Sequence, residues 1–133
     1  MRSASAAGVD AVVLPKRQSA PLNALALKTA QGGAEALFIA EVTNLARTIK
    51  AMQNLGIWVV GADGESTETY THPDLTVPTA IVMGNEGDGL RRLTKELCDF
   101  LVAIPMQGPV SSLNVSVACG ILLFEVGRQR AAN

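Results

Sequence analysis

Short apolar runs alternate along the chain with segments in which apolar residues recur at helical spacing. Runs that are apolar throughout and end at a turn-forming or polar residue are typical of buried strands. The runs that predict strands span residues 9–14, 37–42, 57–60, 79–83 and 100–104. Helices are predicted over residues 22–30, 44–54 and 91–97, and from about Leu113 onward. This alternation is typical of an α/β fold with a mostly parallel sheet covered by helices on both faces.

The predicted helices over residues 22–30 and 44–54 carry start signals. Pro21 suits the first position of a helix, and Thr43 suits an N-cap. The apolar stripe of the second helix consists of Leu45, Ile49, Met52 and Leu55. Because residues at this spacing share one face, we expect that face to pack on the sheet.

The composition fits one globular domain over residues 1–133, of which 48% are hydrophobic. A formal net charge of −1 argues against binding nucleic acid through the net charge of the chain. Any RNA contact must therefore be local. Cys98 and Cys119 lack CxxC spacing, so we expect reduced thiols, and with the single His72 they provide too few ligands for a metal site. No apolar run reaches the roughly 18 residues of a membrane span, which favours a cytoplasmic protein.

Three loops follow the predicted strands at residues 61–78, 84–89 and 106–114. In parallel sheets, ligands collect outside the carboxyl ends of the strands, so these loops are the candidate site. The middle loop, GNEGDG, has glycines that permit tight turns and close approach of the backbone to a ligand. It does not follow the GxGxxG pattern and comes too late in the chain for a dinucleotide-binding turn.

Several polar residues of these loops also have purely structural interpretations. Glu86 can stabilise the start of the following helix, and Ser111 and Ser112 are ordinary N-cap residues. Asn114 is harder to explain in this way, because asparagine is unfavourable inside a helix. A small basic cluster follows the middle loop and consists of Arg91, Arg92 and Lys95. Such a cluster either faces solvent or, beside a cleft, binds phosphate.

Three stretches taken together, RSASAAGVDAVVLPK, IVMGNEGDGL and IPMQGPVSSLNVSVA, resemble the motifs of the SpoU class of RNA 2′-O-ribose methyltransferases in the SPOUT superfamily. The resemblance extends over essentially the whole chain. The stretches VSSLNVSVA and VTNLARTIKAMQNLGIWVVGAD are most similar to the branch that modifies a guanosine in large-subunit ribosomal RNA. The transfer-RNA branch is also similar and stays as an alternative.

The resemblance implies an α/β fold with a deep C-terminal trefoil knot, S-adenosylmethionine as cofactor, and a homodimer. The positions expected to hold the cofactor are Gly84, Ile104 and Leu113. The positions expected to act in catalysis are Arg2, Glu86, Ser112 and Asn114. In the implied reaction a ribose oxygen attacks the sulfonium methyl carbon, a displacement that needs no metal. The arginine is thought to help deprotonate the ribose 2′-hydroxyl, but because arginine stays protonated, stabilising the developing alkoxide is the easier role.

Two further features bear on this interpretation. The NxG half of the first motif, expected just before Met1, and the small N-terminal RNA-binding domain of the family are absent, so we expect a catalytic domain truncated at its N-terminus. The alternative is a cofactor-binding or dimerisation module that does not catalyse. The last helix is apolar on more than one side, which is compatible with a dimer; the residues concerned are Val115, Val117, Ile121, Leu122, Phe124 and Val126.

Overall fold

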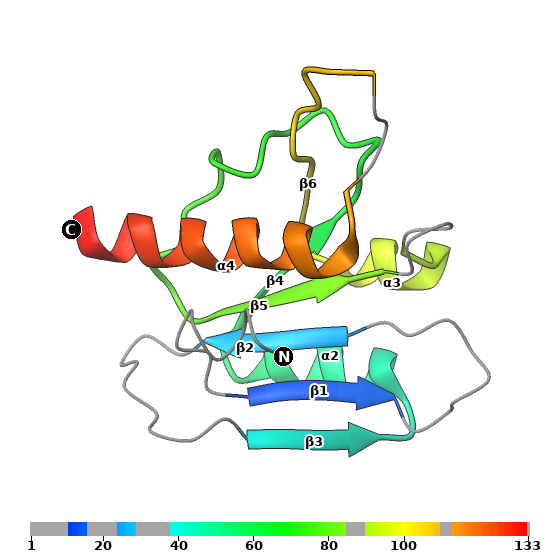
Figure 1. Cartoon of the computed structure of the whole chain (residues 1–133). Coiled ribbons are helices and arrows are strands. Elements are labelled where there is room, and N and C mark those ends of the chain that lie inside the picture. The colour runs from blue at the N-terminus through cyan, green and yellow to red at the C-terminus, as the bar shows by residue number, and fades with distance from the viewer. Residues whose placement is uncertain (1–10, 16–23, 29–37, 85–89, 110–112, 133) are drawn as a thin grey trace.

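The structure is a computed structural model that describes residues 11–15, 24–28, 38–84, 90–109 and 113–132. The strands in this part of the chain are β1 (Ala11–Pro15), β2 (Ala24–Lys28), β3 (Phe38–Val42), β4 (Trp58–Ala62), β5 (Thr79–Met83) and β6 (Phe100–Val102). The helices are α2 (Leu45–Asn54), α3 (Arg92–Leu97) and α4 (Val115–Ala132). Figure 1 shows α4 lying across the sheet.

The strands form one sheet in the order β3-β1-β2-β5-β4-β6. β1 pairs in parallel with β3, and β4 pairs in parallel with both β5 and β6. The prediction of parallel pairing is therefore confirmed for these strands. β2 runs antiparallel to both of its neighbours, β1 and β5, so the sheet is mixed.

The helix predicted over residues 22–30 is wrong, because residues 24–28 form β2 in the described structure. The segment reads ALALK, which alternates with the period of two that a strand requires. Alanine and leucine favour helices, but such propensities are weak and tertiary context overrides them. Here that context is backbone pairing on both sides, to β1 and to β5.

Two details of the helix after β3 also differ from the prediction. Its N-cap is Asn44 and not Thr43, because the Asn44 Oδ1 atom accepts a hydrogen bond from the Arg47 backbone N–H at 3.1 Å. Ile49 and Met52 are buried as predicted, but Leu55 is 80% exposed. The helix ends at Asn54, so Leu55 lies past the last turn that faces the sheet.

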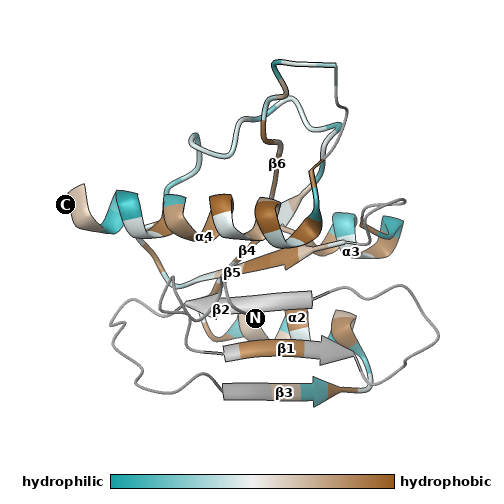
Figure 2. Cartoon of the chain, in the orientation of Figure 1, coloured by the Kyte–Doolittle hydropathy of each residue, from teal (hydrophilic) through white to brown (hydrophobic). Residues whose placement is uncertain are grey.

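The core has one layer on each face of the sheet. Alternate residues of a strand point to opposite faces. On β5, Ile81 packs with Leu122 and Val126 of α4, whereas Val82 packs in the layer that contains Ile49 of α2. Figure 2 shows that β5 is hydrophobic over most of its length, as expected for a strand covered on both sides. In the part of the chain that is described, no helix is long and apolar enough to cross a membrane.

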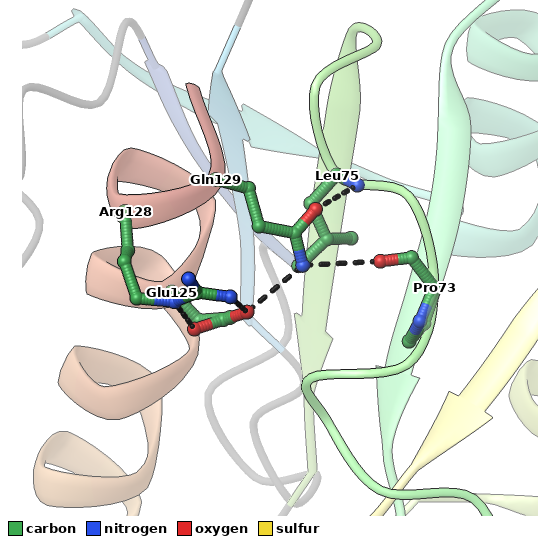
Figure 3. Close-up of polar contacts among 5 residues, drawn as sticks. All are labelled: Pro73, Leu75, Glu125, Arg128 and Gln129. Atoms are coloured by element: carbon green, nitrogen blue, oxygen red, sulfur yellow. Dashed lines mark hydrogen bonds and ion pairs between the residues drawn. The ribbon is translucent and has the colours of Figure 1, made fainter. Parts of the chain in front are cut away.

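The second half of α4 is hydrogen-bonded to the segment that leads into β5 (Figure 3). The buried Glu125 carboxylate accepts hydrogen bonds from Arg128 Nε at 2.7 Å and from Gln129 Nε2 at 2.8 Å. The Arg128 guanidinium holds the pKa of this carboxyl below its usual value. Gln129 also accepts from the Leu75 N–H at 2.7 Å and donates to the Pro73 carbonyl at 3.1 Å. These bonds fix α4 over the sheet.

We expect Gly61→Ala to destabilise the fold by about 1–3 kcal/mol, the usual cost of overpacking a core. A Cβ atom on Gly61 would lie 2.8 Å from Cys98 Sγ, 2.8 Å from Leu90 Cδ1 and 2.9 Å from Leu101 Cδ2. Urea unfolding of this variant is best compared with Gly108→Ala, whose added carbon meets no atom within 4 Å. Equal stability of the two variants would show that these side chains move aside freely.

Candidate active site

A cavity of about 530 Å³ opens at the carboxyl ends of β4, β5 and β6. This is the edge of the sheet where parallel strands are expected to place a ligand. Its walls come from the loop after β4, from the end of β5, from β6 and the residues after it, and from the start of α4. Segments far apart in the sequence therefore meet at one pocket.

The loop after β4 forms one wall of this pocket, and it is hydrogen-bonded to the end of β6 and to the residue that follows it. The Asp63 N–H donates to the Val102 carbonyl at 2.9 Å, and the Ala103 N–H donates to the Glu68 carbonyl at 2.8 Å. A parallel bridge between Thr69 and Ala103 continues this pairing. The loop is thus held in place by backbone hydrogen bonds to Val102 and Ala103.

The predicted cofactor residues come together at the pocket. Gly84 is buried directly after the last residue of β5, Ile104 lies two residues beyond β6, and Leu113 precedes α4. All three line the cavity. Met83 and Val102 add further apolar wall. β6 ends at Val102, two residues before the predicted end, and this leaves Ile104 in the irregular segment that faces the pocket.

Three of the four predicted catalytic residues, Arg2, Glu86 and Ser112, lie outside the described residues. The fourth, Asn114, directly precedes α4 and is exposed. Its side-chain Oδ1 accepts a hydrogen bond from the Ser116 N–H at 2.7 Å. Asn114 is therefore a helix N-cap, and the prediction that it lies inside the helix is wrong. Both of its chain neighbours, Leu113 and Val115, line the pocket, so it stands at the pocket's rim.

Charged residues of the pocket wall had not been singled out from the sequence. Asp63 and Glu68 both line the cavity. One Asp63 carboxylate oxygen lies 3.7 Å from Lys95 Nζ, and one Glu68 oxygen lies 3.3 Å from His72 Nδ1. The signal that could have identified Asp63 is its position directly after a buried strand, at the edge where ligands bind.

The basic cluster after the middle loop divides between two environments. Lys95 reaches the pocket residue Asp63, whereas Arg92 pairs with Glu96 at 3.4 Å on the exposed face of α3. Cys98 follows α3, and burial raises the pKa of its thiol to about 12. Both described cysteines are free thiols, and a thiol with so high a pKa is a poor nucleophile.

Comparison with known proteins identifies the chain. Residues 1–124 match the model of the SpoU rRNA Methylase family. The chain is a member of this family. The 23S rRNA (guanosine-2'-O-)-methyltransferase RlmB of Vibrio cholerae is 59% identical over 133 residues, which are 100% of this chain and 54% of the relative. RlmB of Escherichia coli is 56% identical over 131 residues, 98% of this chain and 54% of the relative. This SpoU family member thus spans about half the length of the curated relatives it matches.

Solved structures support the same family. The TrmH/SpoU tRNA modifying enzyme of A. aeolicus aligns with a TM-score of 0.80 and 32% identity, covering 98% of this chain and 66% of that one. The SpoU methyltransferase AviRb from Streptomyces viridochromogenes, in complex with the cofactor AdoMet, aligns with a TM-score of 0.65 and 34% identity. That alignment covers 74% of this chain and 39% of AviRb.

Proposed function

We propose that this chain is the catalytic domain, residues 1–133, of an enzyme that methylates the ribose 2′-hydroxyl of a guanosine in large-subunit ribosomal RNA. The observation that carries the proposal is the 59% identity to a 23S rRNA guanosine methyltransferase along the whole chain. The transfer-RNA alternative has weaker support, because the aligned tRNA modifying enzyme is 32% identical. A ribosomal RNA substrate would place the reaction in the cytoplasm.

The pocket suits S-adenosylmethionine, the cofactor we propose. Its volume of about 530 Å³ falls in the range of roughly 300–1,000 Å³ for sites that enclose a small molecule. Ile104 and Leu113 provide apolar wall for flat or aliphatic parts of a ligand, and Gly84 permits close approach. Ser66, Thr67 and Thr69 add hydroxyl groups to the rim. When bound, the cofactor supplies a methyl group on a sulfonium cation.

The chain's own residues have to make a weakly acidic ribose hydroxyl nucleophilic and align it with the methyl carbon. We assign the stabilisation of the developing alkoxide to the positive charge of Arg2, because electrostatic stabilisation is usually a large part of catalysis. Glu86, Ser112 and Asn114 are proposed to accept the hydroxyl proton or to orient the ribose. Arg91 and Arg92 are proposed as phosphate contacts, which hold RNA without reading its sequence.

A tritiated methyl donor incubated with the protein and either 23S ribosomal RNA or transfer RNA tests this assignment. We expect label at the 2′-oxygen of a guanosine in the ribosomal RNA. Label in the transfer RNA alone would establish the alternative substrate. Cofactor binding by calorimetry without transfer to either RNA would instead favour a cofactor-binding or dimerisation module.

The family resemblance also implies a C-terminal trefoil knot, which we propose for this chain. Deep knots are rare, and a threaded segment would fix the loops at the strand ends more firmly than short connections do. The likeness to the TrmH/SpoU structure over 98% of this chain supports the proposal.

We propose that two copies of the chain associate through α4. Its outward face exposes Phe124 (54%) and Val117 (52%), an apolar surface that the sheet does not cover. Light scattering at micromolar concentration should show a dimer, and Phe124→Asp should give a monomer. Leu93→Asp, at a similarly exposed position on α3 (58%), is the matched control and should stay dimeric. A monomeric wild type would contradict the proposal.

A further inference from the structure

The charged side chains that line the pocket are all acidic in the described part of the chain. They are Asp63 and Glu68, and no Lys, Arg or His is among the described lining residues. The neighbouring sequence segments 85–89 (NEGDG) and 110–112 (VSS) contain no basic residue either. The described part of the pocket wall therefore presents negative charge to the molecule that occupies it.

Hydrogen bonds hold the Asp63 carboxylate and the Glu68 backbone in place. The Asp63 side chain is 14% exposed, and its Oδ1 accepts the Glu65 N–H at 3.1 Å. The backbone carbonyl of Glu68 accepts the N–H of Ala103, the residue after β6, at 2.8 Å. Lys95 Nζ is 3.7 Å from Asp63, near the upper limit for an ion pair, and its side chain is 31% exposed, so it neutralises this charge only in part.

The proposed reaction changes the charge of what the pocket holds. The bond from ribose oxygen to the methyl carbon forms, the carbon–sulfur bond breaks with its electron pair left on sulfur, and the ribose proton leaves to a base. S-adenosylmethionine carries a sulfonium, an ammonium and a carboxylate, and its net charge is positive. S-adenosylhomocysteine, the thioether product, keeps only the ammonium and the carboxylate and is neutral overall.

We propose that Asp63 and Glu68 make the pocket selective for the cationic methyl donor over its neutral thioether product, so that product exchanges for donor after each transfer. This inference rests on the function proposed above. Charges several ångströms apart near a protein surface interact strongly enough to shift affinity, and we expect about 3- to 10-fold of selectivity from each carboxylate. The competing interpretation is that Asp63 only closes its own turn through the Glu65 N–H.

Isosteric amides separate these interpretations, because they remove the charge and keep the hydrogen-bond acceptor. Calorimetry with S-adenosylmethionine, S-adenosylhomocysteine and sinefungin gives the affinities; sinefungin bears a cationic amine in place of the sulfonium. Asp63→Asn and Glu68→Gln should each lower the donor-to-product affinity ratio about 3- to 10-fold, and sinefungin should follow the donor. Lys95→Gln should raise the ratio. Added salt should reduce all of these differences.

Glu65→Gln is the matched control, because Glu65 is exposed, lies between the two carboxylates in sequence and does not line the cavity. We expect the donor-to-product affinity ratio of Glu65→Gln to equal that of the wild type. The Glu68 side chain is 39% exposed, so Glu68→Gln should fold even if Asp63→Asn does not. The inference is wrong if the wild type binds all three ligands and the donor-to-product affinity ratio is unchanged in Glu68→Gln and Lys95→Gln. That result would leave the proposed cofactor in place. A wild type that binds none of them overturns the proposed cofactor as well.

Discussion

Replacing Gly84 with valine is expected to weaken S-adenosylmethionine binding by at least about 100-fold, or ~2.7 kcal/mol. Gly84 is buried directly after β5 and lines the pocket, so its missing side chain leaves the backbone open to the ligand. Valine adds three carbon atoms at this wall and would take up space that the ligand's atoms need. The loss is steric, so it should not depend on salt.

A second glycine of the same pocket provides the control. Gly64 also lines the cavity, but a Cβ atom added there meets nothing within 4 Å. Gly64→Ala should therefore bind the cofactor like the wild type. Calorimetry measures both affinities, and thermal unfolding checks that both variants are folded. If Gly84→Val bound with wild-type affinity, the cofactor would not occupy the cavity at the end of β5.

The strands that could be located from sequence are those whose burial is encoded locally. Residues 79–83 were predicted as a strand, and β5 has these bounds: all of its positions are buried, and those after Thr79 are apolar. The rule for parallel sheets placed the loops after these strands at one edge of the sheet, since β4, β5 and β6 run in parallel. The family resemblance was needed to single out Gly84, Ile104 and Leu113 within this region.

β2 could not be predicted because its state depends on distant partners. Residues 24–28 alternate like a strand but consist mostly of good helix formers, and pairing with β1 and β5 decides the outcome. The carboxylates of the pocket wall were missed for a related reason. The position of Asp63 directly after β4 indicates the ligand edge of the sheet, but its contacts with Lys95 and Val102 join segments far apart in the chain, and no sequence spacing indicates such contacts.

The position of Asn114 shows how a small shift in a helix boundary changes the interpretation of a residue. Inside a helix, an asparagine would be unfavourable and would suggest a functional role. Directly before the first residue of the helix, asparagine is a favourable N-cap. The hydrogen bond that Asn114 accepts from the Ser116 N–H is therefore a sufficient structural reason for an asparagine at this position. Whether Asn114 also acts on the substrate requires a variant that keeps the cap.

Asn114→Ala is expected to reduce methyl transfer to RNA by about two orders of magnitude, the usual effect of losing a positioned polar group. It also removes the cap, which costs about 1 kcal/mol of stability. Asn114→Asp keeps an oxygen that can accept the Ser116 N–H at the favourable end of the helix dipole, but it lacks the amide donor. Single-turnover transfer by Asn114→Asp therefore decides between the two roles. Wild-type rates in this variant would leave Asn114 as a cap alone.

Arg2→Ala is expected to lower the same single-turnover rate by about two orders of magnitude or more, because the developing alkoxide loses its stabilising charge. Cofactor affinity should change little in both Ala variants, since the proposed contacts to the cofactor come from the backbone and the apolar wall at Gly84, Ile104 and Leu113. A calorimetric titration of each variant checks this second expectation. If Arg2→Ala retained the wild-type rate, Arg2 would not act on the ribose hydroxyl, and Glu86 would become the candidate for the base.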